Sequence, residues 1–89
     1  MRIVVSPTFS RAVKRLHENQ KAALDGAVRE IARNPRLGDA KVGDLAGVRV
    51  FKFRMVDRLC LLAYTQPEDD ILELLALGAH ENFHRDLKR

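Results

Sequence analysis

The chain is poor in several features, and each scarcity excludes a class of protein. Its 89 residues include a single cysteine, Cys60, so an internal disulfide framework is excluded and a reducing compartment is expected. No apolar run approaches the roughly 20 residues that span a bilayer. The N-terminal residues become polar too quickly for a signal peptide. These absences predict a cytoplasmic protein without a membrane segment.

What is present fits an ordinary globular protein. Hydrophobic residues make up 46% of the sequence and charged residues 31%, a balance that disordered chains do not have. A length of 89 residues leaves room for one domain, which we expect to comprise residues 1–89.

The charge is unevenly distributed. The net charge is +4, and residues 1–46 hold nine cations and five anions, whereas residues 47–89 hold seven of each. A basic surface attracts nucleic acid or an acidic partner. Solvated helix faces are the alternative interpretation, and composition alone does not choose between them.

The first half of the chain predicts a short strand and then two helices. Residues 2–5 are mostly β-branched, and Ser6 and Pro7 fit the N-cap and first position of a helix. A tight connection is expected at residues 17–19, and the second helix should stop near Asn34 because Pro35 follows. Apolar residues recur with helical spacing at Phe9, Ala12, Val13 and Leu16, and again at Leu24, Ala27, Val28 and Ile31.

The second half predicts a loop, three strands and a helix. Residues 35–47 have little periodicity, residues 48–54 alternate, and residues 59–64 are apolar on both faces. A turn is expected at residues 66–70, a strand at 71–77 that Gly78 ends, and a helix at 79–89. The order β-α-α-β-β-β-α predicts an α+β fold with a helical hairpin packed on a small, mainly antiparallel sheet and a short C-terminal helix.

Three segments carry a resemblance to a known family. They are residues 44–47 (Asp-Leu-Ala-Gly) leading into 50–54 (Val-Phe-Lys-Phe-Arg), residues 75–78 (Leu-Ala-Leu-Gly), and the closing residues 80–89. In this order the sequence resembles the RelE/ParE toxin superfamily of type II toxin–antitoxin systems over essentially its whole length. The resemblance implies a toxin bound by a cognate antitoxin in a hetero-oligomer. RelE-like members are metal-independent endoribonucleases that cut mRNA, commonly on the ribosome; ParE-like members poison DNA gyrase without chemistry of their own.

Cleaving RNA without a metal requires cations on the phosphate, a base for the 2′-hydroxyl and an acid for the leaving oxygen. Lys52 and Arg54 lie two apart in a predicted strand, so their side chains point the same way, as a phosphate clamp requires. The resemblance implies catalytic roles for Arg58, His80 and His84, and no cofactor. Arg85 and Lys88 are candidate RNA contacts, although charged residues at a chain end more often lie in solvent. His84 stands where many members carry a tyrosine.

Each assignment has a plainer alternative. Basic residues on an edge strand also discourage edge pairing, His80 fits a helix cap, and His84 fits a solvated surface position. Residues 80–84 also spell H-E-x-x-H, a zinc-hydrolase spacing, but the only other histidine is His17, so no metal site is predicted. We therefore expect an mRNA endoribonuclease, with gyrase inhibition as the alternative and zinc hydrolysis as a remote one.

Overall fold

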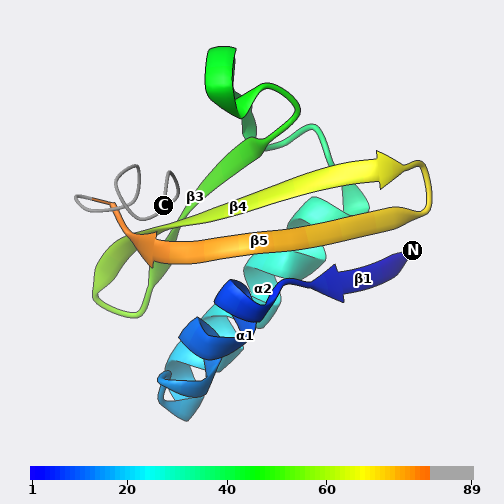
Figure 1. Cartoon of the computed structure of the whole chain (residues 1–89). Helices are drawn as coiled ribbons and strands as arrows, with labels where there is room; N and C mark the ends of the chain where they lie inside the picture. Colours follow the sequence, from blue (N-terminus) through cyan, green and yellow to red (C-terminus); the bar gives the residue numbers. More distant parts are fainter. Residues whose placement is uncertain (81–89) are drawn as a thin grey trace.

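The computed structural model describes residues 1–80 as two helices and a five-stranded sheet. Its elements are β1 (Arg2–Val5), α1 (Pro7–Lys14), α2 (Glu18–Arg33), β2 (Asp39–Ala40), the 3-10 helix η1 (Gly43–Leu45), β3 (Arg49–Met55), β4 (Arg58–Glu68) and β5 (Ile71–Ala79). The strand order is β1-β5-β4-β3-β2, with β1 parallel to β5 and the other pairs antiparallel (Figure 1). The predicted α+β fold is confirmed. The predicted C-terminal helix lies outside the described residues, except that Ala79 belongs to β5.

Helix α1 begins where the sequence indicates, and α2 begins about two residues earlier than expected. Ser6 caps α1, and its Oγ accepts the Phe9 N–H at 3.0 Å while donating to the Leu75 carbonyl at 2.6 Å. That carbonyl lies where β4 and β5 shift register, so one side chain satisfies a helix end and a bulged strand together. The connection between the helices is residues 15–17 rather than 17–19, because the His17 N–H donates to Gln20 Oε1 at 2.8 Å and starts α2 earlier.

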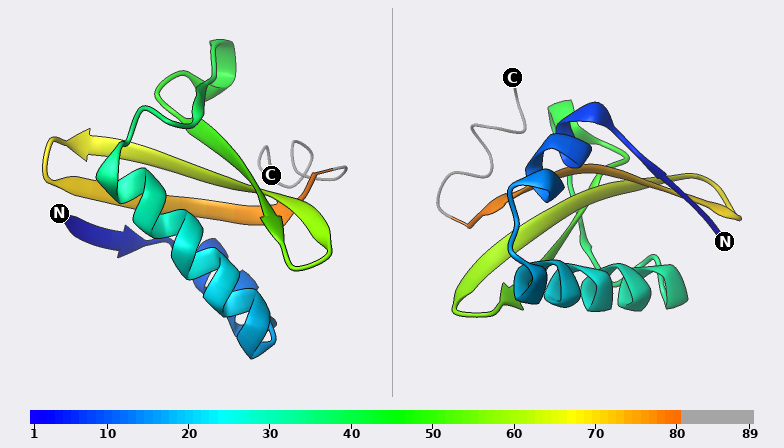
Figure 2. Two further views of the ribbon diagram at one scale, coloured as in Figure 1. Left: turned by 180° about the vertical axis from the view of Figure 1, so that it is seen from behind. Right: turned by 90° about the horizontal axis from the view of Figure 1, so that it is seen from below.

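The core fills the space between the helices and one face of the sheet. Figure 2 shows α2 crossing this face, which we call the helical side. Its fully or nearly fully buried residues come from α1, α2 and alternate positions of β3, β4 and β5: Phe9, Leu24, Ile31, Met55, Cys60, Leu62, Tyr64, Leu72 and Leu74. Neither helix of residues 1–80 is long and apolar enough to cross a membrane.

The segment expected to be a featureless loop has a short strand and fixed anchors. β2 pairs with the start of β3, opposite Val50 and Arg49. The Tyr64 hydroxyl donates to the Pro35 carbonyl at 2.6 Å and accepts the Gly38 N–H at 2.9 Å. The Arg49 guanidinium donates to the Gly38 carbonyl at 2.8 Å. These contacts join residues that are distant in the sequence, so no periodic pattern in residues 35–47 predicts them.

β4 is longer than the sequence predicts. It continues through Pro67 to Glu68, and the turn shrinks to residues 69 and 70. β3 pairs with β4 only as far as Tyr64, so the part of β4 beyond it lacks that neighbour. The ladder with β5 is also irregular between Thr65 and Glu68. Pro67 therefore needs no N–H for the sheet and can stay in the strand.

A two-residue turn joins β3 to β4. Met55 and Arg58 are directly paired, leaving residues 56 and 57 as the turn. Val56 has a φ of 60°, a conformation that favours glycine and is strained for a β-branched residue. The hairpin therefore ends in a strained tip, which lies next to the candidate site.

Candidate functional site

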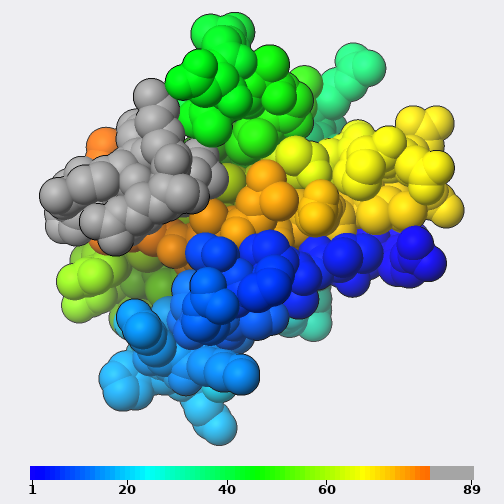
Figure 3. Space-filling view, viewed as in Figure 1, coloured from blue at the N-terminus to red at the C-terminus, as the bar shows by residue number. Residues whose placement is uncertain are grey.

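The sheet face turned away from α2, here called the outer face, holds the site candidates. Figure 3 shows this side of the molecule, with β4 and β5 in yellow and orange between the green segment that contains η1 and the blue β1 and α1. Its centre is a small apolar cluster of buried residues, Val50, Leu61, Ala63 and Ala76. Exposed cations on this face therefore lie beside an apolar patch.

Lys52 and Arg54 lie on the outer face as the alternation predicts. Both are exposed, and in the β3–β4 register Lys52 is opposite Leu61 and Arg54 is opposite Leu59. Phe51 and the residue two further along β3 point to the helical side, where their rings stack with centroids 6.3 Å apart. Within residues 1–80, neither cation has a hydrogen-bond or ion-pair partner, so both charges can receive a ligand.

His80 joins the same part of the outer face. Its N–H donates to the Leu59 carbonyl at 3.3 Å, which extends the β4–β5 register by one residue beyond the pair of Cys60 and Ala79. Leu59 thus lies between Arg54 and His80 in one line across three strands. With neighbouring strands about 4.8 Å apart, the α-carbons of Arg54 and His80 are about 10 Å apart.

These residues line a groove of about 490 Å³ at the end of the sheet. Its lining is Arg54, Asp57, Arg58, Leu59, Ala79 and His80. Sequence reasoning missed Asp57 and Leu59. The two-residue turn at residues 56 and 57 would have indicated both residues, because it brings the start of β4 beside Arg54. The length of this turn is known only from the β3–β4 pairing in the structure.

Arg58 is placed differently from Lys52 and Arg54. It is paired with Met55 and lies two residues from Cys60, so strand alternation puts it on the helical side. Burial raises the pKa of the Cys60 thiol, and the Arg58 charge partly offsets that rise. The guanidinium therefore acts on the helical side of the hairpin while also lining the groove on the outer face.

The remaining predicted site residues, His84, Arg85 and Lys88, lie outside the described residues, as does the H-E-x-x-H motif beyond His80. Among residues 1–80, no three His, Cys, Asp or Glu side chains gather where they could hold a metal ion. Within residues 1–80, the groups on the outer face thus include the imidazole of His80 and the exposed cations Lys52 and Arg54, a set suited to phosphate binding and proton transfer.

The chain is similar to known toxins in sequence and in fold. The sequence profile of a family described as "ParE-like toxin of type II bacterial toxin-antitoxin system" matches residues 3–88. The fold is similar to the isolated E. coli RelE toxin, with a TM-score of 0.68 and 16% identity over 99% of this chain and 96% of that one.

Two further solved structures have similar folds. A chain of the intact E. coli RelBE toxin–antitoxin complex gives a TM-score of 0.70 at 15% identity, over 88% of this chain and 94% of that one. A mutant E. coli RelE in complex with an antitoxin RelBc peptide gives 0.68 at 15% identity, over 99% and 95%. No curated protein matches the chain in sequence.

Proposed function

The chain belongs to the ParE-like toxin family of type II bacterial toxin–antitoxin systems, and we propose that it is a metal-independent mRNA endoribonuclease neutralised by a cognate antitoxin. One observation carries the nuclease proposal: Arg54 and His80 flank Leu59 in one line across the outer face, and Lys52 lies two residues from Arg54. Arg54 and a proton-transfer group thus line one groove, and Lys52 adds a second cation on the same face of β3.

The geometry supports a division of labour in attack by the 2′-hydroxyl on the adjacent phosphate. Lys52 and Arg54 bind the non-bridging oxygens and stabilise the negative charge that develops on them. The His80 imidazole exchanges a proton with the reacting oxygens, since an imidazole can donate and accept near neutral pH. The reaction needs a second proton-transfer group, and His84 is the candidate that the sequence offers.

Cleavage of an end-labelled RNA oligonucleotide, with and without ribosomes, tests the proposal. We expect products that end in a 2′,3′-cyclic phosphate. In the reaction without ribosomes, EDTA should not prevent their formation. Lys52→Ala with Arg54→Ala should lower kcat/KM by about 10²–10³, and His80→Ala by about 10²–10⁴. Arg33→Ala, which removes an exposed cation from the far end of α2, is the matched control. Intact RNA in every condition, or full activity of His80→Ala, would end the proposal.

The same variants connect chemistry to toxicity. The double Lys52 and Arg54 variant should relieve growth arrest on induction while its circular dichroism spectrum and melting temperature stay those of the parent. Undiminished toxicity in a stably expressed double variant would show that the outer face is not the toxic site.

Two of the solved structures with similar folds support an antitoxin partner. One similar chain comes from a toxin–antitoxin complex and another is bound to an antitoxin peptide. On this chain, we expect the antitoxin to cover the exposed cations of the outer face. Co-purification of the protein encoded beside this gene, with loss of RNA cleavage in the complex, is the corresponding test.

Gyrase inhibition is the second candidate, and the position of Arg58 favours it. A RelE-like nuclease is expected to present three cations from β3 and β4 on one sheet face. Here strand alternation places Arg58 on the helical side, away from Lys52 and Arg54. Mapping transcript 5′ ends together with gyrase-linked DNA breaks after induction separates the two functions. Breaks with intact mRNA would identify a gyrase poison.

A further inference from the structure

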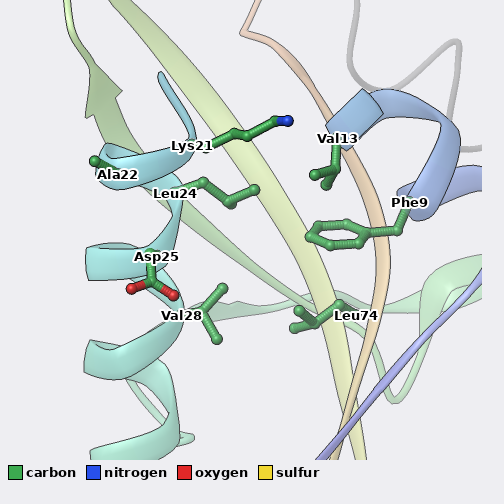
Figure 4. A pocket seen from close by; sticks show the side chains of 8 residues that line it. All are labelled: Phe9, Val13, Lys21, Ala22, Leu24, Asp25, Val28 and Leu74. Carbon is green, nitrogen blue, oxygen red and sulfur yellow. The ribbon is translucent and has the colours of Figure 1, made fainter. Parts of the chain in front are cut away.

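Two of the grooves on the helical side differ in charge. The first lies between α1, α2 and β5 and has a volume of about 480 Å³ (Figure 4). Apolar side chains, including those of Phe9, Leu24 and Leu74, line most of it. Lys21 and Asp25 also line it with opposite charges, so it has no preference for a charged ligand.

The second groove lies between the end of α1, the start of α2 and the β3–β4 hairpin, with a volume of about 320 Å³. Its apolar lining is Ala12, Leu16, Met55, Cys60, Leu77 and Ala79. Arg15 and Arg58 supply its charges, and none of the described residues that line it is acidic. Two guanidinium groups beside an apolar floor select a ligand that is both anionic and aliphatic.

Arg58 connects this second groove to the candidate site. It lines both grooves, as does Ala79, since both residues lie at the end of the sheet that separates them. Strand alternation and the effect of Arg58 on the pKa of the Cys60 thiol both place its charge near the second groove. Its long side chain can nevertheless reach around the sheet end, because the residue is exposed.

We propose that the second groove binds an acidic, aliphatic peptide segment of a partner protein, and that a carboxylate of this segment holds Arg58 away from the outer face. Aliphatic side chains fill the apolar floor while carboxylates pair with Arg15 and Arg58. The effect on the outer face rests on the proposed RNA-cleaving site, whereas the binding of the peptide does not.

An acidic peptide suits this groove better than RNA does. A phosphodiester would pair with the two guanidinium groups but leave the floor of Met55, Cys60 and Leu77 without an apolar partner. Leucine-like side chains beside carboxylates satisfy both parts of the lining at once.

The two methionines of the chain make the binding directly measurable. Met55 is buried in the groove floor, and Met1 is 53% exposed at the start of the chain, so methyl-¹³C methionine gives a reporter and an internal control. The probe is an acetylated, amidated hexapeptide of alternating leucine and glutamate. We expect it to move the Met55 signal and not that of Met1. The matching leucine–glutamine peptide should bind at least about ten-fold more weakly.

Charge variants locate the contact. Arg15→Gln and Arg58→Gln should each weaken the leucine–glutamate peptide about five-fold, as expected for exposed ion pairs. Arg33→Gln, which removes the same charge at the far end of α2, should leave the affinity unchanged. An unmoved Met55 signal, or equal shifts with the glutamine peptide, would overturn the proposal, and so would an RNA oligonucleotide that moves Met55 instead.

A second measurement tests the link between the grooves. Saturating leucine–glutamate peptide should weaken RNA binding to the full chain as much as Arg58→Gln does, and should add nothing in the Arg58→Gln variant. Unchanged RNA affinity would overturn the link. If the chain neither binds nor cuts RNA, the proposed function fails, while the Met55 titration still decides the peptide groove.

Discussion

Replacing Tyr64 with phenylalanine removes one oxygen atom from the centre of the fold. Tyr64 is fully buried, and its hydroxyl makes two hydrogen bonds, to the Pro35 carbonyl at 2.6 Å and from the Gly38 N–H at 2.9 Å. Phenylalanine keeps the ring and its packing. The substitution therefore isolates the anchoring of residues 35–38, the start of the segment that leads to β3 and the candidate site.

The size of the effect follows from the partners left behind. A buried donor or acceptor that loses its partner costs about 1–3 kcal/mol. The N–H of Gly38 is buried and the carbonyl of Pro35 is half-buried, so we expect a total loss of about 2–4 kcal/mol. A domain of this size has a free energy of unfolding of about 4–13 kcal/mol. Its melting temperature should fall by about 8–32 °C.

Urea unfolding followed by circular dichroism measures the loss. The control is Thr65→Val, which removes the neighbouring 3.2 Å side-chain hydrogen bond to Glu73 at a half-buried site and should cost no more than about 1 kcal/mol. A Tyr64→Phe variant within about 0.5 kcal/mol of the parent would refute the reasoning, because it would show that the two bonds do not anchor the segment.

Three further expectations follow from the hairpin and its surroundings. Val56→Gly should raise the free energy of unfolding by about 1 kcal/mol by relieving the positive φ; a lower melting temperature would contradict this. Burial raises the pKa of the Cys60 thiol from 9.0 and of the Tyr64 hydroxyl from 10.0. The unfolded chain therefore releases these protons first, and stability that is complete below pH 9 should fall as pH rises further, less steeply in Cys60→Ala. Exchanging two neighbours, Arg58→Leu with Leu59→Arg, should keep or raise RNA cleavage and weaken leucine–glutamate peptide binding about five-fold; the reverse pattern would contradict both proposals.

Most of the fold is predictable because its signals are local. The 3.6-residue stripes, the Ser6 cap and Pro35 mark the two helices to within a few residues. The predictions are wrong where the local structure depends on strands that are distant in the sequence. Pro67 predicts a turn in the sequence. It belongs to β4 in the structure because β3 pairs with β4 only as far as Tyr64, so no N–H of residue 67 is needed for that pairing. The short strand β2 forms because Val50 and Arg49 lie opposite it, which no property of residues 39–40 reveals.

The candidate site is predictable only in part. Lys52 and Arg54 share a face by the two-residue period of a strand, and the register confirms it. Gly78 was expected to end the last strand, but β5 continues to Ala79 and carries His80 into line with Leu59. Sequence spacing does not show this, because a glycine can either end a strand or continue it.

Arg58 shows why one position could not be read from the pattern. Residues 59–64 are apolar at every position, so hydrophobicity does not distinguish the two faces of β4. The turn gives no help either, because a valine is not the residue that marks a positive φ. Core packing determines the face of Arg58. Cys60 packs on the helical side, and Arg58, two residues away in the same strand, therefore lies on that side too. Exchanging Arg58 and Leu59 moves one charge by a single residue at constant composition. Its effect on cleavage thus shows directly which face uses this cation.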